Sequence, residues 1–323
     1  MSKGLRLTMI AATLVIALAV GFMALRDTAK AEEKYINFTD STGETVKIPE
    51  HPKRVVILNA SNVDMYYGAG GTVVGRPSTT AYDEKLKEKL AAVTEIGNIH
   101  SPNVETILSL NPDLVIGVNV PFHTNLRETL AAAGIPLIIN KLDAYEDVLT
   151  TLDFYGELTG NSAAADKEKE RIVKAHDEIA AKSSAQPSPK CLLIFGSPNS
   201  FSMATTKSFG GSLLKELNAE NIADNVPNID SAFIPLSMEF VTKANPDIIF
   251  FISMYPNPAI ANSFKEEMAN NSLWQGVSAV KTGRIYYLAG NLFTVNPGTK
   301  IDTALEILYK DLYAPDSAAK EGK

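Results

Sequence analysis

One phrase occurs twice in this sequence, and it constrains the fold more than any other feature. VETILSLNPDLVI begins at residue 104, and MEFVTKANPDIIF begins at residue 238. The spacing from Glu105 to Asp113 recurs from Glu239 to Asp247, and PKRVVILNASN and PKCLLIFGSPN precede the two copies. A repeat this long is too large for one unit of a solenoid. It therefore predicts two similar lobes.

Within each half, short apolar runs alternate with helical patterns. The runs VVILNAS, DLVIGVN and IPLIIN in the first half, and CLLIFGS, DIIFFIS and RIYYLAG in the second, are typical of buried parallel strands. Between the halves, a stretch rich in Ala, Lys, Glu and Asp has apolar residues at helical spacing, which predicts one long solvated helix. We therefore expect an α/β fold with two Rossmann-like lobes, residues 32–145 and 186–323, a linking helix over 146–185 and a ligand cleft between the lobes.

The first 31 residues have the pattern of an export segment. Lys3 and Arg6 precede a stretch without charge from Leu7 to Leu25, and Ala-Lys-Ala at 29–31 fits a cleavage site. The apolar stretch is also long enough to span a bilayer, so residues 1–31 are either a signal peptide or an N-terminal membrane anchor. Both predict a protein in the periplasm or at the outer face of the cytoplasmic membrane, membrane-associated if the segment is retained.

Composition and motifs exclude several function classes. The 323 residues have a net charge of -7, which argues against a nucleic-acid partner. The lone Cys191 lies in an apolar run and predicts a buried thiol. GAGGTVVG lacks the spacing of a dinucleotide fingerprint and the Lys-Ser/Thr of a P-loop, and the chain has no H-E-x-x-H, C-x-x-C or G-x-S-x-G. We expect a binding protein rather than an enzyme.

The doubled phrase has a structural and a functional interpretation. Each proline disfavours the helical region for the asparagine before it, which ends a helix ahead of a strand. Glu105 and Glu239 fall in the first turns of the predicted helices, where the helix dipole favours a carboxylate. Two carboxylates at equivalent points of two lobes could equally engage two basic sites on a symmetric partner. Both interpretations stay open at this stage.

Several segments together resemble a known family. They are the export segment, PKRVVIL, GNIHSPNVETILSLNPDLVI, SFGGSLLKELNAENIA, PLSMEFVTKANPDIIFF and WQGVSAVKTGRIYYL. Over residues 35–313 the chain resembles the ABC-transporter substrate-binding proteins of the haem, siderophore and vitamin B12 class, the type with a helical backbone between its lobes. The resemblance implies delivery of a captured ligand to an ABC permease with its ATPase, by a protein we expect to be a monomer. It also places Glu105 and Glu239 at the positions of the family's permease-docking glutamates.

Within that class, the chain is most similar to haem-binding members of the iron-regulated surface determinant type. Those proteins place a Met before the first glutamate phrase and a His after the second-lobe Asn-Pro-Asp strand, and both coordinate haem iron. Here the first position carries His100 and the second carries Met254. A His/Met pair suits low-spin haem iron whichever lobe supplies which ligand. The resemblance thus implies haem as the transported ligand, with a ferric siderophore or cobalamin as alternatives and an exported haem-modifying enzyme as a third.

Loops after the predicted strands carry aromatic, Met, His and Asn side chains that suit an apolar slot for a porphyrin face. Ordinary core packing is the alternative for each of them. Glycines of SFGGS, before a predicted helix, either expose backbone amides to an anionic group or serve the turn alone. The candidate ligand-binding residues are Asn62, Met65, Tyr66, Tyr82, Phe122, His123, Met203, Phe209, Tyr255 and Phe293.

Overall fold

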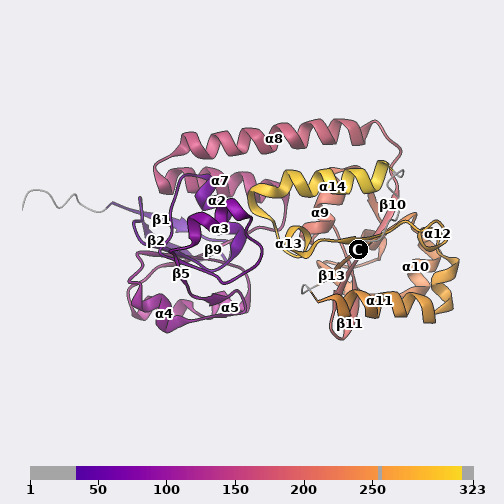
Figure 1. The fold of residues 1–323 in the computed structure, drawn as a ribbon, viewed down its shortest axis with the longest axis horizontal. Coiled ribbons are helices and arrows are strands. Elements are labelled where there is room, and N and C mark those ends of the chain that lie inside the picture. Colours follow the sequence, from indigo (N-terminus) through magenta and orange to yellow (C-terminus); the bar gives the residue numbers. More distant parts are fainter. Residues whose placement is uncertain (1–33, 254–256, 315–323) are drawn as a thin grey trace, which may run out of the picture.

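The computed structural model describes residues 34–253 and 257–314. Two lobes lie side by side along the long axis of the molecule, and one long helix, α8 (Ser162–Ser184), runs across both of them (Figure 1). The predicted mixed α/β fold with two lobes is confirmed. Residues 1–31, predicted as a signal or anchor, lie outside the described ranges. Within those ranges, no helix has both the length and the hydropathy needed to cross a bilayer.

The N-terminal lobe is built on a parallel sheet with the strand order β5-β4-β3-β8-β9. Its strands are β3 (Val55–Ile57), β4 (Gly75–Arg76), β5 (Thr94–Glu95), β8 (Leu114–Val118) and β9 (Leu137–Asn140). Its helices are α2 (Ala60–Gly68), α3 (Glu84–Leu90), α4 (Val104–Ser109), α5 (Pro121–Thr124) and α6 (Arg127–Ala132). Strands β3, β8 and β9 are buried on both faces because helices cover both, which explains their unbroken apolar runs.

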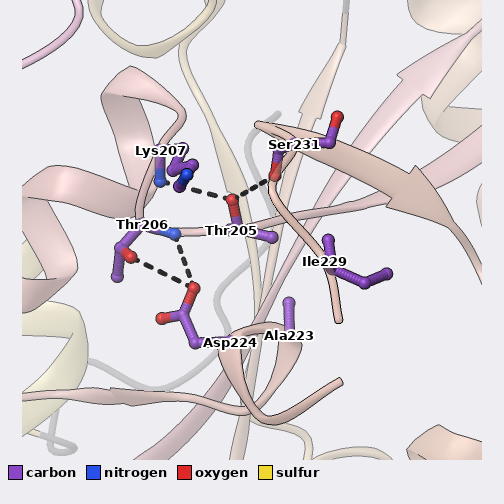
Figure 2. A pocket seen from close by; sticks show the side chains of 7 residues that line it. All are labelled: Thr205, Thr206, Lys207, Ala223, Asp224, Ile229 and Ser231. Carbon is purple, nitrogen blue, oxygen red and sulfur yellow. Dashed lines mark hydrogen bonds between the residues drawn. The ribbon is translucent and has the colours of Figure 1, made fainter. Parts of the chain in front are cut away.

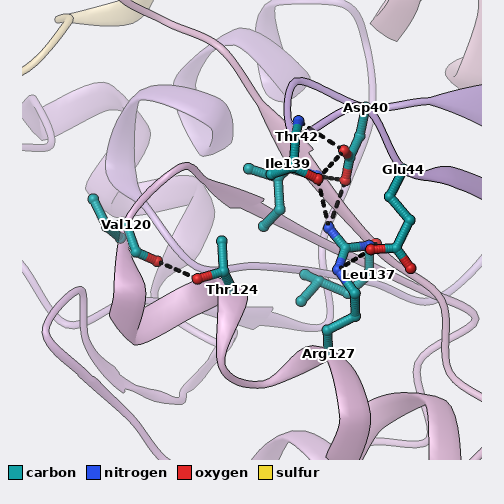
Figure 3. Close-up of polar contacts among 8 residues, drawn as sticks. All are labelled: Asp40, Thr42, Glu44, Val120, Thr124, Arg127, Leu137 and Ile139. Atoms are coloured by element: carbon teal, nitrogen blue, oxygen red, sulfur yellow. Dashed lines mark hydrogen bonds and ion pairs between the residues drawn. The ribbon is translucent and has the colours of Figure 1, made fainter.

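Two hairpins complete this lobe, β1 (Tyr35–Thr39) with β2 (Thr45–Pro49) and β6 (Gly97–Asn98) with β7 (Ser101–Pro102). A polar cluster ties the first hairpin to the sheet (Figure 3). The Arg127 guanidinium donates to the Asp40 carboxylate at 2.7 Å and to the Leu137 carbonyl, and the Ile139 amide donates to the same carboxylate. Burial alone would raise the pKa of Asp40, but the hydrogen bonds from Thr42 and Arg127 hold it below its usual value.

The C-terminal lobe repeats the centre of the sheet but not its edge. Its strand order is β13-β11-β10-β14-β15, with β12 beside the start of β10. The strands are β10 (Lys190–Ser197), β11 (Ser200–Ala204), β12 (Glu220–Asn221), β13 (Phe233–Pro235), β14 (Ile248–Ser253) and β15 (Ile285–Leu288). The helices are α9 (Phe209–Glu216), η1 (Ile222–Asn225), α10 (Met238–Ala244), α11 (Pro258–Asn270), η2 (Ser272–Gly276), α12 (Ser278–Lys281), α13 (Gly290–Phe293), η3 (Gly298–Lys300) and α14 (Ile301–Tyr313).

Strands β10, β14 and β15 are parallel and correspond to β3, β8 and β9, whereas β11 pairs antiparallel with β10, and β13 pairs antiparallel with β11. The difference begins at the end of β10, where Ser197 pairs with Ser200 across a two-residue turn and the chain reverses directly. In the first lobe, helix α2 follows β3 instead and returns the chain for another parallel strand. The buried free thiol of Cys191 in β10 agrees with the sequence prediction.

The doubled Asn-Pro-Asp is a joint between helix and strand. Asn111 and Asn245 both take the left-handed conformation, with φ of 45° and 49°, at the ends of α4 and α10. The Asp113 carboxylate accepts from the amides of Lys53 and Arg54, at 2.6 Å and 2.9 Å. The Asp247 carboxylate accepts from the Lys190 amide at 3.2 Å. Each aspartate thus fastens its own strand to the start of the neighbouring strand, which is where Pro-Lys recurs in the sequence.

The segment 146–185 was predicted to form one linking helix. The structure instead divides it between two helices, so the prediction of a single helix is wrong. Helix α7 (Tyr145–Thr159) ends at Gly160, whose φ is 66°, and Asn161 then caps α8 by accepting from the Ala164 amide. Gly-Asn is a strong stop and start signal. Val148, Leu152 and Tyr155 bury α7 in the first lobe, so only α8 fits the prediction of a long, largely exposed helix.

A second connection between the lobes lies near the C-terminus. After α13, residues 296–300 return to α2 of the first lobe, where the Asp64 carboxylate accepts from the Thr299 amide and hydroxyl, both at 2.7 Å. The Ser61 hydroxyl donates to the Asn296 carbonyl. Helix α14 then packs along α8 over the second lobe (Figure 1). One continuous apolar cluster includes side chains of both sheets, α7, α8, α9 and α14.

Candidate functional site

His100 is at the tip of the β6-β7 hairpin. Asn98 pairs with Ser101, so Ile99 and His100 form the two-residue turn. The Asn98 side-chain oxygen accepts from the backbone amides of His100 and Ser101, at 2.9 Å and 3.1 Å. Gly97 has a φ of 90°, and a Cβ there would lie 2.4 Å from the Ser101 carbonyl oxygen, so only glycine permits this turn. The turn leaves the His100 side chain exposed.

Two consecutive residues of α5 lie against this tip. The Phe122 ring meets the His100 imidazole edge to face, with 5.3 Å between centroids, although 48% of Phe122 is exposed. His123 is fully buried. Its Nδ1 accepts from the Val118 amide, and its Nε2 donates to the Ile99 carbonyl, both at 3.1 Å. Burial lowers the pKa of His123 to about 4, so the imidazole is neutral at physiological pH with both nitrogens hydrogen-bonded.

The other candidates of the first lobe are packed inside it. Met65, Tyr66 and Tyr82 are buried in the apolar core. The Asn62 amide donates to Asn59 and its oxygen accepts from the Tyr155 hydroxyl, which makes it part of a buried polar network. Helix α2 directs Asn62, Met65 and Tyr66 into the interface between helix and sheet, whereas Tyr82 is buried just before α3. In this structure they have the packing role that the sequence allowed as the alternative.

In the second lobe, two candidates lie together at a small apolar hollow of about 20 Å³. Phe209 and Phe293 line it with residues of β10, β11, β13 and β14. Phe233, which the sequence analysis missed, contributes a ring that is 43% exposed and 4.8 Å from the Phe195 ring. The sequence signal that could have found Phe233 is an aromatic residue within the short apolar run Phe233–Pro235. The full lining is Leu193, Phe195, Ala204, Ser208, Phe209, Gly210, Phe233, Ile252, Phe293 and Thr294.

The remaining candidates of this lobe have other surroundings. Met203 pairs with Ile234 in the sheet and is buried in the core on the far side of β10 and β14. Met254 and Tyr255 lie outside the described residues, and they directly follow Ser253, the last residue of β14. In SFGGS, the Ser208 hydroxyl accepts from the Gly211 amide, and a Cβ at Gly211 would lie 2.0 Å from the Thr205 carbonyl oxygen. Gly211 is thus required by the turn itself.

A separate cavity of about 210 Å³ lies at the end of β11 (Figure 2). The Asp224 carboxylate accepts from the Thr206 amide at 2.8 Å and from its hydroxyl at 3.1 Å. The cavity is lined by Thr205, Thr206, Lys207, Ala223, Asp224, Ile229 and Ser231, which include none of the predicted site residues.

Glu105 and Glu239 have matching positions in the two lobes. Each is exposed in the first turn of its helix, α4 or α10. Each helix is capped by the residue two positions before the glutamate, since Asn103 accepts from the Thr106 amide and Ser237 from the Phe240 amide. The duplicated phrase therefore presents two equivalent carboxylates on the surface.

The fold and this geometry agree with comparisons to known proteins. The family model described as a periplasmic binding protein matches residues 55–292, from β3 to within α13. The chain belongs to the periplasmic binding protein family. The predicted family resemblance is thereby confirmed.

Curated relatives of the chain are bacterial binding proteins. It is 28% identical to the Fe(3+)-citrate-binding protein YfmC of Bacillus subtilis over 280 residues, covering 85% of each chain. It is 28% identical to the high-affinity heme uptake system protein IsdE of Staphylococcus aureus over 251 residues, covering 76% of this chain and 81% of IsdE. It is 27% identical to the putative ABC transporter substrate-binding lipoprotein YhfQ of Bacillus subtilis, covering 80% of this chain and 82% of YhfQ.

Solved structures share the fold. The S. aureus IsdE complexed with heme superimposes with a TM-score of 0.72 at 24% identity, covering 80% of this chain and 98% of that one. An ABC transporter substrate-binding protein from Listeria monocytogenes gives a TM-score of 0.73 at 24% identity, covering 82% and 99%.

Proposed function

We propose that this protein is the extracytoplasmic substrate-binding component of an ABC importer, and that it captures haem between its lobes. The family and the named relatives support an importer role for an iron-containing ligand. The observation that carries the haem assignment is the exposed His100 at a rigid hairpin tip beside Phe122. An imidazole nitrogen at such a position can coordinate haem iron.

The chemistry of the second lobe favours a tetrapyrrole over ferric citrate or an anionic siderophore. Among the described residues, those lining the hollow around Phe209, Phe233 and Phe293 include no charged side chain. A polyanionic iron complex needs cationic partners when it leaves water, whereas a porphyrin offers flat apolar faces to aromatic rings. Figure 1 shows α5 and β13 on the sides of the lobes that are turned toward each other. Cobalamin, also a macrocycle, is the alternative cargo.

The second axial ligand in this proposal is Met254. Its support is its position in the sequence, because it directly follows β14 and the carboxyl ends of parallel strands are where ligands bind in such sheets. A His from one lobe and a Met from the other would then hold the iron between them.

Delivery would use the two glutamates. Glu105 and Glu239 are exposed at equivalent places, and each is on a short helix of its own lobe. Two carboxylates related in this way suit a permease dimer that presents an arginine to each lobe, because carboxylate–arginine pairs are strong and directional.

Haem titration tests the cargo and the His100 ligand. The mature protein should bind ferric haem with a sharp Soret band, and His100→Ala and Met254→Ala should each weaken binding by about tenfold or more, since each loses an axial ligand. His51→Ala is the matched control, because His51 is also an exposed histidine but contacts the end of α7. No binding of haem, together with binding of cobalamin or ferric citrate, would refute the haem assignment. Chemical change of bound haem in the presence of a reductant would favour an enzyme instead.

A further inference from the structure

We infer that His123 is a positioning residue that holds His100 in place for the cargo, through the Ile99 carbonyl. This inference rests on the proposed function, because it concerns the residue that we propose as an iron ligand. His123 was itself a candidate for ligand contact, but its burial and its two hydrogen bonds give it a different role.

The hydrogen bonds of His123 fix both its tautomer and its orientation. The Val118 amide can only donate, so Nδ1 must be the accepting nitrogen of a neutral ring. Nε2 therefore carries the hydrogen, and it donates to the Ile99 carbonyl. The ring thus joins the carboxyl end of β8 to the residue directly before His100.

The hairpin needs such a support. It pairs only Gly97–Asn98 with Ser101–Pro102, and two-stranded ribbons of this size are not stable alone. Its base is held by the Ser78 amide, which donates to the Gly97 carbonyl at 2.8 Å. Its tip is joined to β8 by His123. The neighbouring Phe122 contacts the His100 ring, so two consecutive residues of α5 set the backbone and the ring of the same tip.

The site for the His123 ring is closely fitted. A Cβ added to Gly117 of β8 would lie 3.1 Å to 3.3 Å from His123 atoms, and these are its three nearest neighbours. Gly117 thus makes room for the imidazole, and Gly117→Ala would displace the ring by a few tenths of an ångström without removing it. A support that is bonded at both nitrogens and enclosed this closely transmits its position to the hairpin tip.

Two amide substitutions separate the bond to Ile99 from the bond to Val118. His123→Gln places an amide NH₂ near the position of Nε2 and can keep the bond to the Ile99 carbonyl. His123→Asn places an oxygen near Nδ1 and can keep the bond from the Val118 amide but not the bond to the tip. The two variants bury similar polar groups, so they serve as controls for each other.

The test uses ferric haem and the mature protein, with binding affinity and spin state read from the absorption spectrum. We expect His123→Asn to weaken haem binding about tenfold and to move the ferric haem from low spin toward high spin, as His100→Ala does. His123→Gln should stay within about threefold of the wild type, and Gly117→Ala should fall between the two. Equal effects of the Asn and Gln variants on spin state would overturn the inference, because a merely structural role does not depend on which bond is kept.

Hydrogen exchange without haem separates failure of this inference from failure of the proposed function. If His123 anchors the tip, amides of residues 99–101 exchange faster in His123→Asn than in His123→Gln in the free protein. If that difference is found but His100→Ala leaves the haem spectrum unchanged, the proposed iron ligand is wrong and the anchor stands. If the two variants exchange equally at residues 99–101, the anchor is wrong, whatever haem does.

Discussion

At the scale of single residues, burial changes the pKa of Asp311, a carboxyl group far from the candidate site. Burial raises the pKa of Asp311 on α14 to about 6, while the nearby Arg284 opposes the shift. Arg284 does not neutralise the effect, because its guanidinium donates to the carbonyls of Asp311 and Leu312, at 3.1 Å and 2.8 Å. It thus caps the end of the helix, where a cation is favourable.

Asp311→Asn should change the pH dependence of stability. A folded-state pKa above the usual 3.8 means that the folded protein binds the proton more tightly, so this group's contribution is complete below pH 3.8 and is lost as pH rises through about 6. The asparagine variant lacks this loss, so its melting temperature relative to wild type should increase between pH 4 and pH 7. Glu306→Gln, which changes an exposed carboxylate of the same helix, is the control. Parallel melting curves for Asp311→Asn and wild type across that range would contradict the prediction.

At the scale of elements, the doubled phrase forms the joint between a helix and a strand in each lobe, and it also presents an exposed glutamate. The sequence predicted that the proline would end each helix, and α4 and α10 do end there. It did not predict that Asn111 and Asn245 would both turn left-handed. Asparagine tolerates that conformation better than other residues with a Cβ, and this explains its choice before both prolines.

Replacing Asn111 tests this joint. Asn111→Ala should destabilise the protein by about 1 kcal/mol, because alanine has a Cβ and lacks the side chain that makes the left-handed region tolerable. Asn111→Gly should be within about 0.5 kcal/mol of wild type, since glycine has no steric penalty there. Urea unfolding measures both. Asn245 is not an equivalent test in the other lobe, because its side chain also accepts from the Ser278 amide at 2.8 Å. Equal stabilities of the Ala and Gly variants would show that the backbone conformation is not what the asparagine provides.

The sequence predicted the central strands of both sheets and the helices of the doubled phrase, because apolar runs and helical periodicity are local signals. It missed β11, because the two-residue turn between Ser197 and Ser200 lies in a polar stretch that gives no sign of the chain's direction. At the candidate site, the prediction reached His100 and Phe122, which the structure brings together. It could not distinguish buried from exposed histidines or place Phe233, because these depend on contacts between distant segments.

At the scale of the whole molecule, the lobes are joined twice. Helix α8 spans both of them, and the returning segment 296–300 binds α2 through Asp64 and Thr299. Burial raises the pKa of Asp64, although the hydrogen bonds from Thr299 oppose this shift. The Asp64 carboxylate stabilises the junction because it accepts from both the amide and the hydroxyl of Thr299.

Asp64→Ala should weaken this junction. The substitution leaves the Thr299 amide and hydroxyl without their acceptor, which costs about 2 kcal/mol of unfolding free energy. Asp64→Asn retains an acceptor oxygen and should cost less than half as much. Denaturant unfolding measures both, and Asp153→Ala, in an exposed ion pair with Lys169, serves as the surface control. A loss for Asp64→Ala no greater than for the control would show that the junction does not stabilise the fold.

The double connection also has an energetic consequence for a carrier. Two lobes that are connected at two places and share one apolar core can move little relative to each other. Little of the binding free energy of a ligand is therefore consumed in bringing them together. A protein built in this way does not release its ligand simply by opening its lobes. In the function proposed above, release of the cargo therefore depends on work done by the ABC transporter.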